Sequence, residues 1–261
     1  MYLDGCMKSV KLNLIFQKSD PRDLKYTSYL TKVPDVVDLT ATGSVPPVYD
    51  QGQFGTCTAN SAGWLLNYLI GRGSGIKFTA SRMFVYANAR TLDGTPLTED
   101  SGTTLRSTFK SIDKFRTLDE SKYAYNAAHL THKPPNLDYA IALTHKKFVY
   151  VSVPQTLHGL QTCLANGFPV SFGVEVYTSF MENACINTGI VPMPDTEKER
   201  IEGGHAILLV GYDNADKTFL FLNSWGTEVG LPNKRGFFKI PYDYVLDPQL
   251  ANDFWTAHLF M

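Results

Sequence analysis

The sequence has little of what marks several special classes of protein. Four cysteines among 261 residues, with no CxxC pair, exclude a disulfide scaffold and argue against a structural zinc site. No run of about 18 apolar residues is present, so a membrane span is not expected. Lysine and arginine total 24 against 25 aspartates and glutamates, so the basic excess typical of nucleic-acid binding is missing.

The amino-acid composition is that of a globular protein. Hydrophobic residues make up 44% of the chain and charged residues 19%, which excludes wholesale disorder and a collagen-like fibre. A chain of this length can bury about 70–75% of its unfolded surface. That is enough for one large domain or for two lobes around a cleft.

The N-terminal region is predicted to be an arm. Residues 1–36 mix charges and show no sustained hydrophobic period, so we interpret them as an N-terminal arm or a short propeptide-like segment. The first residues make a poor secretory signal, because Asp4 comes early and the apolar stretch that follows is short. We therefore expect a cytoplasmic location or the interior of a virion or host cell, with secretion left open. Cys6, Cys163 and Cys185 are interpreted as buried free thiols.

Helical periodicity marks the first half of the chain. One helix is predicted to begin at Cys57 and to end at Gly71, a second to run from Ser81 to about Arg90, and a third from about Thr104 to Phe115. After about residue 145, runs rich in Val, Ile, Phe and Tyr predict strands, interrupted by a short helix over 155–166. The strands are expected at 147–153, 170–177, 205–212, 218–223, 236–240 and 256–260.

This order of elements predicts the fold class and the domain organisation. Helices that precede strands indicate an α+β fold and not the alternation of a doubly wound sheet. We predict one domain over 37–261, with a mainly helical lobe at about 45–140 and a mainly β lobe at about 141–261. Two unlike lobes leave a cleft between them, which is a usual place for a site.

Cys57 is the candidate nucleophile. It lies at the start of the first predicted helix, where unpaired N–H groups and the helix dipole favour a thiolate, so we expect its pKa to be lowered. Gln51, six residues earlier, carries a side-chain amide. Together with the backbone N–H of Cys57, that amide could form an oxyanion hole.

A histidine and an asparagine suited to such a nucleophile follow in the second half. His205 opens a predicted strand and comes after Gly203 and Gly204, which would let a substrate backbone approach closely. Asn223 ends a further strand and could accept a hydrogen bond from the His205 ring, fixing its tautomer. Trp225 could shield that hydrogen bond from water.

These residues give the chain its resemblance to the papain-like cysteine peptidases. His205 and Asn223 follow Cys57 by roughly 150 and 165 residues, in the Cys–His–Asn order of that family. The resemblance covers roughly 35–261. It implies two lobes, a helical left lobe and an antiparallel β-sheet or barrel on the right, with the active-site cleft between them. It implies Cys57 as nucleophile, His205 as base and then acid, Asn223 as orienting residue and Gln51 as oxyanion donor.

The resemblance also implies substrate-binding residues and partners. Ser101 and Gly102 occupy the place of the family's glycine-rich substrate-binding stretch, and Gly102 is expected to bond the substrate through its main chain. Gly204 and Trp225 would line the opposite wall. The expected partners are a protein or peptide substrate and the N-terminal segment itself. No cofactor is expected, and no metal, because the other histidines lack metal-ligand spacing.

Departures from the family pattern point to one of its branches. Lysosomal and plant members usually have cysteine where Phe54 stands, and tryptophan where Thr58 stands. Phe54 therefore removes one half of a usual disulfide. Val229 replaces a second family tryptophan. The pattern is similar to the disulfide-poor bacterial and viral branch.

The expected activity is that of a cysteine-type peptidase, with an endopeptidase favoured. Two alternatives stay open at this point: a catalytically inert papain-like module that binds peptides, and a cysteine enzyme that transfers the acyl group to an amine. The complete set of Gln51, Cys57, His205 and Asn223 favours hydrolysis over both. As in family zymogens, residues 1–36 could cross the cleft, or they could pack along the back of a lobe.

Overall fold

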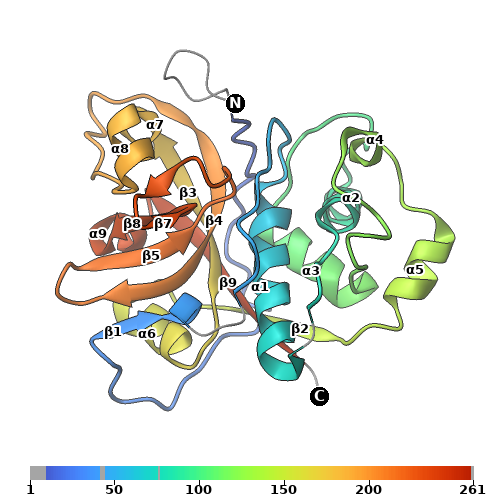
Figure 1. The fold of residues 1–261 in the computed structure, drawn as a ribbon, viewed down its shortest axis with the longest axis horizontal. Coiled ribbons are helices and arrows are strands. Elements are labelled where there is room, and N and C mark those ends of the chain that lie inside the picture. The colour runs from blue at the N-terminus through green and yellow to red at the C-terminus, as the bar shows by residue number, and fades with distance from the viewer. Residues whose placement is uncertain (1–9, 42–44, 76, 260–261) are drawn as a thin grey trace.

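The helices and the sheet lie side by side, with one long helix between them. The structure is a computed structural model that describes residues 10–41, 45–75 and 77–259. Helix α1 (Cys57–Ser74) runs down the centre of the molecule, the helical lobe lies on one side of it and the sheet on the other (Figure 1). The helical lobe contains α2 (Arg82–Asp93), α3 (Leu105–Phe115), α4 (Ala127–Leu130) and α5 (Asn136–Ala142).

Side-chain caps start the two longer helices of this lobe where the sequence predicts them. Ser81 accepts a hydrogen bond from the N–H of Phe84, and Thr104 accepts one from Ser107, so each satisfies an otherwise unpaired donor of the first turn. Helix α1 differs from its prediction at its C-terminus. It continues past Gly71 to Ser74 and ends on Gly75, which has φ 68° and donates to the Gly71 carbonyl. Arg72 in this last turn donates to the Gly167 carbonyl at 2.6 Å, a tertiary contact that favours the continued helix against the low helix propensity of Gly71.

The second lobe is built on one seven-stranded sheet in which every strand pair is antiparallel. Its order is β2-β9-β3-β4-β5-β8, and β1 pairs with β4 off this path. The strands are β1 (Val36–Asp38), β2 (Phe148–Ser152), β3 (Val170–Tyr177), β4 (Ile201–Asp213), β5 (Thr218–Leu222), β8 (Phe237–Pro241) and β9 (Ala251–Leu259). Over the described residues this path is open, so the fold is mixed α+β without a closed barrel.

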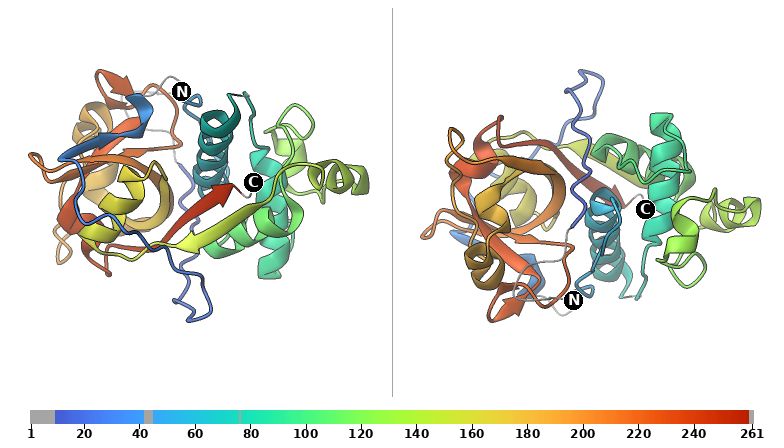
Figure 2. Two further views of the ribbon diagram at one scale, coloured as in Figure 1. Left: turned by 90° about the horizontal axis from the view of Figure 1, so that it is seen from below. Right: turned by 90° about the horizontal axis from the view of Figure 1, so that it is seen from above.

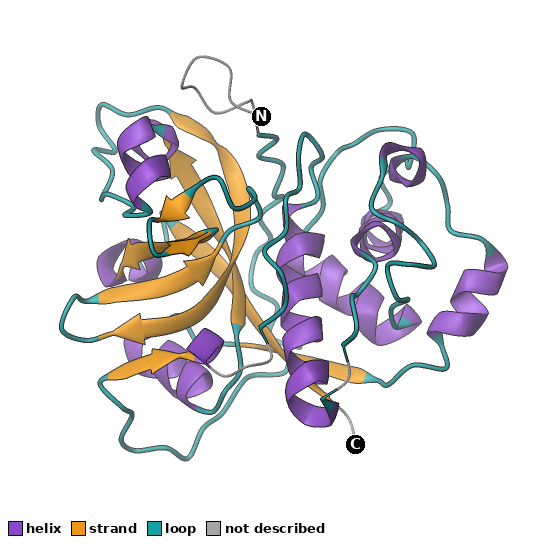
Figure 3. Ribbon diagram, viewed as in Figure 1, coloured by secondary structure: helices purple, strands orange, loops and turns teal. Residues whose placement is uncertain are grey.

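Short elements complete this lobe (Figure 3). They are the 3-10 helix η1 (Leu39–Ala41), α6 (Leu157–Ala165), α7 (Thr178–Met181), α8 (Asn183–Thr188), α9 (Tyr242–Leu246) and the ribbon of β6 (Gly230–Leu231) with β7 (Lys234–Arg235). The final strand begins at Ala251, five residues before its predicted start. β1 begins at Val36, so a strand of the sheet spans the predicted boundary between arm and domain.

One apolar core joins α1 to the sheet. Trp64 and Leu65 of α1 and Phe172 of β3 belong to the same buried cluster. A second, smaller cluster lies inside the helical lobe around Met83 and Phe84. The N-terminal residue of α1 is therefore held at the junction of the two lobes by packing on both sides.

The structure shows the state of two further cysteines and whether any described helix could span a membrane. Cys163 and Cys185 are buried free thiols, and burial raises the pKa of both, that of Cys185 to about 12. Cys6 lies outside the described residues. No helix within the described part of the chain has the length and apolar character needed to cross a bilayer.

Phe172 offers a test of the shared core. It is fully buried and stacks on Phe254, with ring centroids 5.0 Å apart. We expect Phe172→Ala to lower the free energy of unfolding by about 3–5 kcal/mol, because the cavity it leaves cannot fully collapse. Urea unfolding measures this change. Leu137→Ala, at a side chain that is 69% exposed, is the control and should change stability by less than about 0.5 kcal/mol. Similar losses in both variants would contradict the packing described here.

Candidate active site

Cys57 is the first residue of α1, and its thiol lies where the two lobes meet. The side chain is fully buried. Backbone N–H groups of Ala206, Thr58 and Asn13 approach its sulfur, so β4 and the N-terminal arm both reach the thiol. Ala206 directly follows His205, which places the predicted nucleophile next to the predicted base.

His205 is held on one side by Asn223 and covered by Trp225. Its Nε2 lies 2.9 Å from Oδ1 of Asn223, which also accepts the N–H of Ser224 at 2.8 Å. Because that oxygen can only accept, Nε2 carries the proton and Nδ1 is the basic nitrogen. The Trp225 indole stacks on the imidazole with centroids 5.0 Å apart. Nδ1 has no hydrogen-bond partner among the described residues, so it remains free to take a proton.

Gln51 carries its amide toward the same centre. Its Oε1 accepts the Ser224 hydroxyl at 2.6 Å, and its backbone N–H donates to the Ser224 carbonyl at 2.8 Å. These two bonds fix the side chain so that Nε2 is the atom left to donate. Nε2 donates to the Phe54 carbonyl at 2.9 Å and to the carbonyl of Lys11, in the arm, at 3.2 Å.

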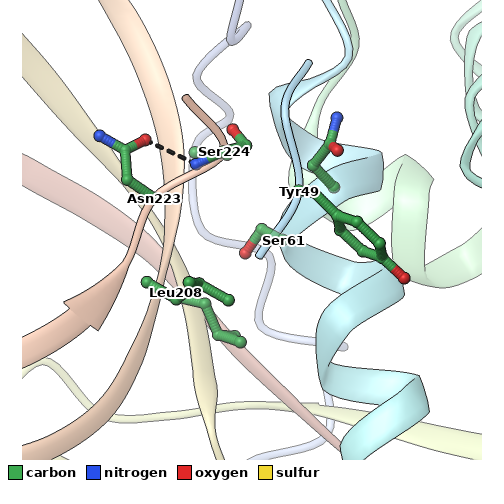
Figure 4. Close-up of a pocket in the computed structure, with 8 residues that line it drawn as sticks. Tyr49, Ser61, Leu208, Asn223 and Ser224 are labelled. Carbon is green, nitrogen blue, oxygen red and sulfur yellow. Dashed lines mark hydrogen bonds between the residues drawn. The ribbon is translucent and has the colours of Figure 1, made fainter. Parts of the chain in front are cut away.

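A small cavity lies beside this cluster, between α1 and the sheet (Figure 4). Its volume is about 10 Å³, and it is lined by Tyr49, Asn60, Ser61, Ala206, Leu208, Leu222, Asn223 and Ser224. A space of this size is at the lower limit for one water molecule. The interface under the catalytic cluster is therefore closely packed, which restricts how far the two lobes can shift there.

The N-terminal arm occupies the groove above Cys57. Figure 2 shows it passing between the sheet and α1. Leu14 donates its N–H to the Gly204 carbonyl at 3.0 Å, and Ile15 donates to the Thr103 carbonyl at 3.3 Å, so the arm pairs with one wall from each lobe. Of the two packing modes left open by the sequence, the structure shows residues 10–17 in the groove. The arm then runs along the β lobe, where Tyr26 donates to the Ser152 carbonyl.

Glycines make this close contact possible. A Cβ on Gly102, which has φ +78°, would overlap the Asn13 carbonyl oxygen. A Cβ on Gly204 would lie 2.8 Å from the Leu14 oxygen. Gly102 donates its own N–H to the Tyr86 hydroxyl at 2.9 Å, and the Ser101 hydroxyl points to the Gly102 carbonyl. On this wall it is therefore the Thr103 carbonyl, and not the main chain of Gly102, that accepts the main-chain hydrogen bond from the arm.

Charged side chains fasten the arm at both ends of the groove. Lys11 pairs with Asp100 at 2.8 Å, and Arg106 pairs with Asp23 at 2.7 Å. Arg106 also donates to the Gln17 side chain, and the Gln17 N–H donates to Asp253. Lys11 and Gln17 belong to no motif, and the mixed charge of the arm is the only sign of their contacts in the sequence.

The prediction of a lowered Cys57 pKa is wrong for this state of the protein. Burial raises the pKa of the Cys57 thiol to about 11, in spite of the N–H groups around it. Burial also lowers the pKa of His205 to about 4. The physical reason is burial, to which the arm at Asn13 and the Trp225 ring both contribute, so that each group is favoured in its uncharged form. The pair is held as thiol and neutral imidazole.

No obvious metal site accompanies this cluster. Within residues 10–41, 45–75 and 77–259, no group of three or more His, Cys, Asp or Glu side chains is arranged to hold a metal ion. The site itself combines a thiol at a helix N-terminus, a histidine held by an asparagine, and an amide turned toward them. That arrangement belongs to the cysteine-dependent hydrolases.

Comparison with known proteins gives the family. The sequence model of the papain family of cysteine proteases matches residues 33–246. A peptidase C1-like protein of Acanthamoeba polyphaga mimivirus is 35% identical over 256 residues, which cover 93% of this chain and 81% of the viral protein. The chain belongs to the papain family of cysteine proteases.

Solved structures and a mammalian relative agree with this assignment. Xylellain, a cysteine protease from Xylella fastidiosa, matches over the whole of both chains with a TM-score of 0.88 and 33% identity. Digestive procathepsin L 3 of Tenebrio molitor has a TM-score of 0.69 at 19% identity, which shows the shared fold alone. Procathepsin L of Mus musculus is 28% identical over 223 residues, which cover 82% of this chain and 62% of the mouse protein.

The contacts of the arm suggest a test of whether it limits the access of a reagent to the Cys57 thiol. Leu14 is buried in the groove, so Leu14→Asp in the full chain should expel the arm, because a carboxylate there loses its hydration. We expect alkylation of Cys57 by a peptidyl epoxide to become at least tenfold faster, measured by mass spectrometry of the adduct. Leu24→Asp is the matched control, since Leu24 is an arm residue that is 62% exposed. Equal rates in both variants would show that the arm does not limit access.

Proposed function

We propose that the protein hydrolyses peptide bonds through Cys57, with His205 as base and then acid, Asn223 as the residue that orients His205, and Gln51 as an oxyanion donor. The observation that carries the proposal is the 2.9 Å bond from His205 Nε2 to Asn223, which leaves Nδ1 basic beside the start of α1. Membership of the papain family supports the same roles.

The chemistry follows from these positions. Nδ1 of His205 takes the thiol proton, and the Cys57 sulfur attacks the carbonyl carbon of the substrate. The oxyanion is held by Nε2 of Gln51 and the N–H of Cys57. His205 then protonates the leaving nitrogen as the C–N bond breaks. It next takes a proton from water, whose hydroxide displaces the sulfur from the thioester.

The same proposal includes a substrate class. Gly102, Gly204 and Trp225 would line the path of an extended peptide, with Ser101 beside Gly102. Glycine walls recognise main chain and not side chains, so the substrate is a protein or peptide in extended form. The Gln51 amide donates to the carbonyl of Lys11, and the arm continues through the groove beyond this residue. A groove that admits a continuous chain suits an endopeptidase.

The proposal extends to control by the N-terminal arm, which would make the chain a zymogen. Lys11 places its carbonyl at the Gln51 amide, whereas the atom that the arm presents to the Cys57 sulfur is the N–H of Asn13. An N–H is not an electrophile, so the arm fills the site without offering a bond to attack. The neutral state of the catalytic pair supports the same reading.

The proposal places the enzyme in a reducing compartment, such as the cytoplasm or the interior of a virion or host cell. What supports this is that Cys57, Cys163 and Cys185 are all free thiols. Disulfides are favoured in oxidising compartments and rare in reducing ones.

The test of the proposed function is peptide hydrolysis by the full chain carrying Leu14→Asp. We expect Gln51→Ala in that chain to lower kcat by about 100-fold or more with little change in KM, because the lost donor acts on the transition state. Cys57→Ala should abolish hydrolysis altogether. Near-normal turnover in the Gln51 variant would refute the oxyanion role, and binding of peptides without cleavage by the parent chain would indicate an inert binding module.

The arm should be released as the pH falls. In the closed state burial lowers the pKa of His205 to about 4, and in an open site it returns toward 6.5. Between pH 6.5 and 4 the open form therefore binds a proton on His205 that the closed form does not bind. The free energy that favours the closed form over the open form falls across this range by roughly 3 kcal/mol. The lowered pKa of Asp100, where burial is outweighed by its bonds to Lys11 and Tyr86, acts in the same direction. The raised pKa of buried Asp253 acts against it.

The measurement compares Cys57 alkylation in the wild-type chain and in a Leu14→Lys chain between pH 7 and 4.5, because a lysine keeps its charge throughout this range. Their ratio cancels most of the effect of pH on the thiol itself. We expect the ratio of wild-type to variant rates to rise toward one at the acid end. A ratio that stays constant across this range would rule out release by protonation.

A further inference from the structure

The two oxyanion donors belong to one short loop. Gln51 begins it, and Cys57 follows its last residue, Thr56. The loop has no regular helix or strand, and its one backbone bond across the turn runs from the Phe54 N–H to the Gln51 carbonyl at 3.3 Å. Thr56 makes no side-chain cap to α1. The Gln51 amide also donates to the Phe54 carbonyl at 2.9 Å, but neither bond reaches Thr56 or Cys57. The distance between the two donors therefore also depends on contacts from outside the loop.

Tyr125 supplies such a contact at both ends of the loop. Its hydroxyl donates to the Gln51 carbonyl at 3.0 Å and lies 2.5 Å from the Thr56 hydroxyl oxygen. Its ring meets the Phe54 ring edge to face, with centroids 5.8 Å apart. One side chain from the helical lobe thus touches the first, the middle and the last part of the loop that carries the oxyanion donors.

The protons of these contacts run in one direction. Tyr125 has one hydroxyl proton and the Gln51 carbonyl can only accept it, so the Thr56 hydroxyl, which accepts the Asn60 amide at 3.0 Å, gives its own proton to the Tyr125 oxygen. Tyr125 in turn gives its proton to the Gln51 carbonyl, which can only accept. Each bond in such a chain polarises the next, which strengthens the last one.

The buried guanidinium of Arg82 fixes the first group in this series of hydrogen bonds, Asn60, and the plane of the Tyr125 ring. Arg82 donates to the Asn60 oxygen at 2.8 Å and pairs with both carboxylate oxygens of Glu120. Its guanidinium carbon lies 3.8 Å from the centroid of the Tyr125 ring and 3.9 Å from that of Tyr49. The tyrosine is therefore stacked as well as hydrogen-bonded, and its hydroxyl has little freedom to move.

We propose that Tyr125 is a positioning residue for the oxyanion hole, setting the spacing between the Gln51 amide and the Cys57 N–H through its hydroxyl; this rests on the proposed function. Tyr125 does not touch the substrate. Its effect belongs to the transition state, since only there does negative charge on the carbonyl oxygen need both donors at once.

The test is Tyr125→Phe in the full chain that carries Leu14→Asp. The phenyl ring keeps its contacts with Phe54 and Arg82 and loses only the two hydroxyl bonds. We expect kcat for peptide hydrolysis to fall about tenfold with KM nearly unchanged, as for a small misplacement of a catalytic group. Alkylation of Cys57 by iodoacetamide forms no oxyanion, so its rate should stay within about twofold of the parent rate. Tyr139→Phe, which removes a hydroxyl bonded to Asn88, is the matched control and should leave both rates unchanged.

A double variant shows whether the effect passes through Gln51. When Gln51→Ala is already present, most of the tenfold loss from Tyr125→Phe should disappear, because the donor that it positions is gone. A full tenfold loss in that background would overturn the proposal. So would unchanged kcat in Tyr125→Phe, or equal losses in hydrolysis and alkylation, which would mark a general defect of the fold. If the parent chain cleaves no peptide, the proposed function fails first; if only the Tyr125 results fail, the proposed function stands.

Discussion

The whole site depends on one contact between the lobes. Ser61, one turn after Cys57 in α1, donates its hydroxyl to the Ile207 carbonyl at 3.0 Å and lies 2.6 Å from the Ser171 hydroxyl. Ile207 is two residues beyond His205 in β4. The proposed nucleophile and base come from different elements and distant parts of the chain, so their distance is set by this buried polar contact and the apolar core around it. The pair works only if α1 and the sheet keep their mutual position.

With the arm in the groove, burial determines the protonation state of Cys57 and His205. With the groove filled, Cys57 and His205 lose water and each prefers its neutral form. The helix N-terminus and the nearby N–H groups still favour a thiolate, but desolvation outweighs them. In the state described here, hydration and not the helix N-terminus therefore decides the protonation of this pair.

The sequence was a good guide wherever a role needs a particular side chain. Capping by Ser81, the start of α3 near Thr104 and the extent of β3 could be predicted because local hydrogen bonding and apolar alternation determine them. The likeness of Cys57 and His205 to the family pattern led to the site. The arm could not be placed, because it binds through main-chain groups at Thr103 and Gly204 that any sequence offers. For the same reason the direction of the Cys57 pKa shift was missed, since it depends on what covers the thiol.

The way the arm is attached has a consequence for competition in the groove. Residues 24–26 are held against Ser152, and the groove segment ends near Gln17, so only a short connection separates anchor from occupant. A segment tethered this closely has a local concentration in the millimolar range or above, whatever the concentration of the protein. Under the control by the arm that we propose, dilution would not free the groove, and a substrate at micromolar concentration would compete poorly. A single cut in the connection would turn the same contacts into an ordinary bimolecular complex, which dissociates when diluted.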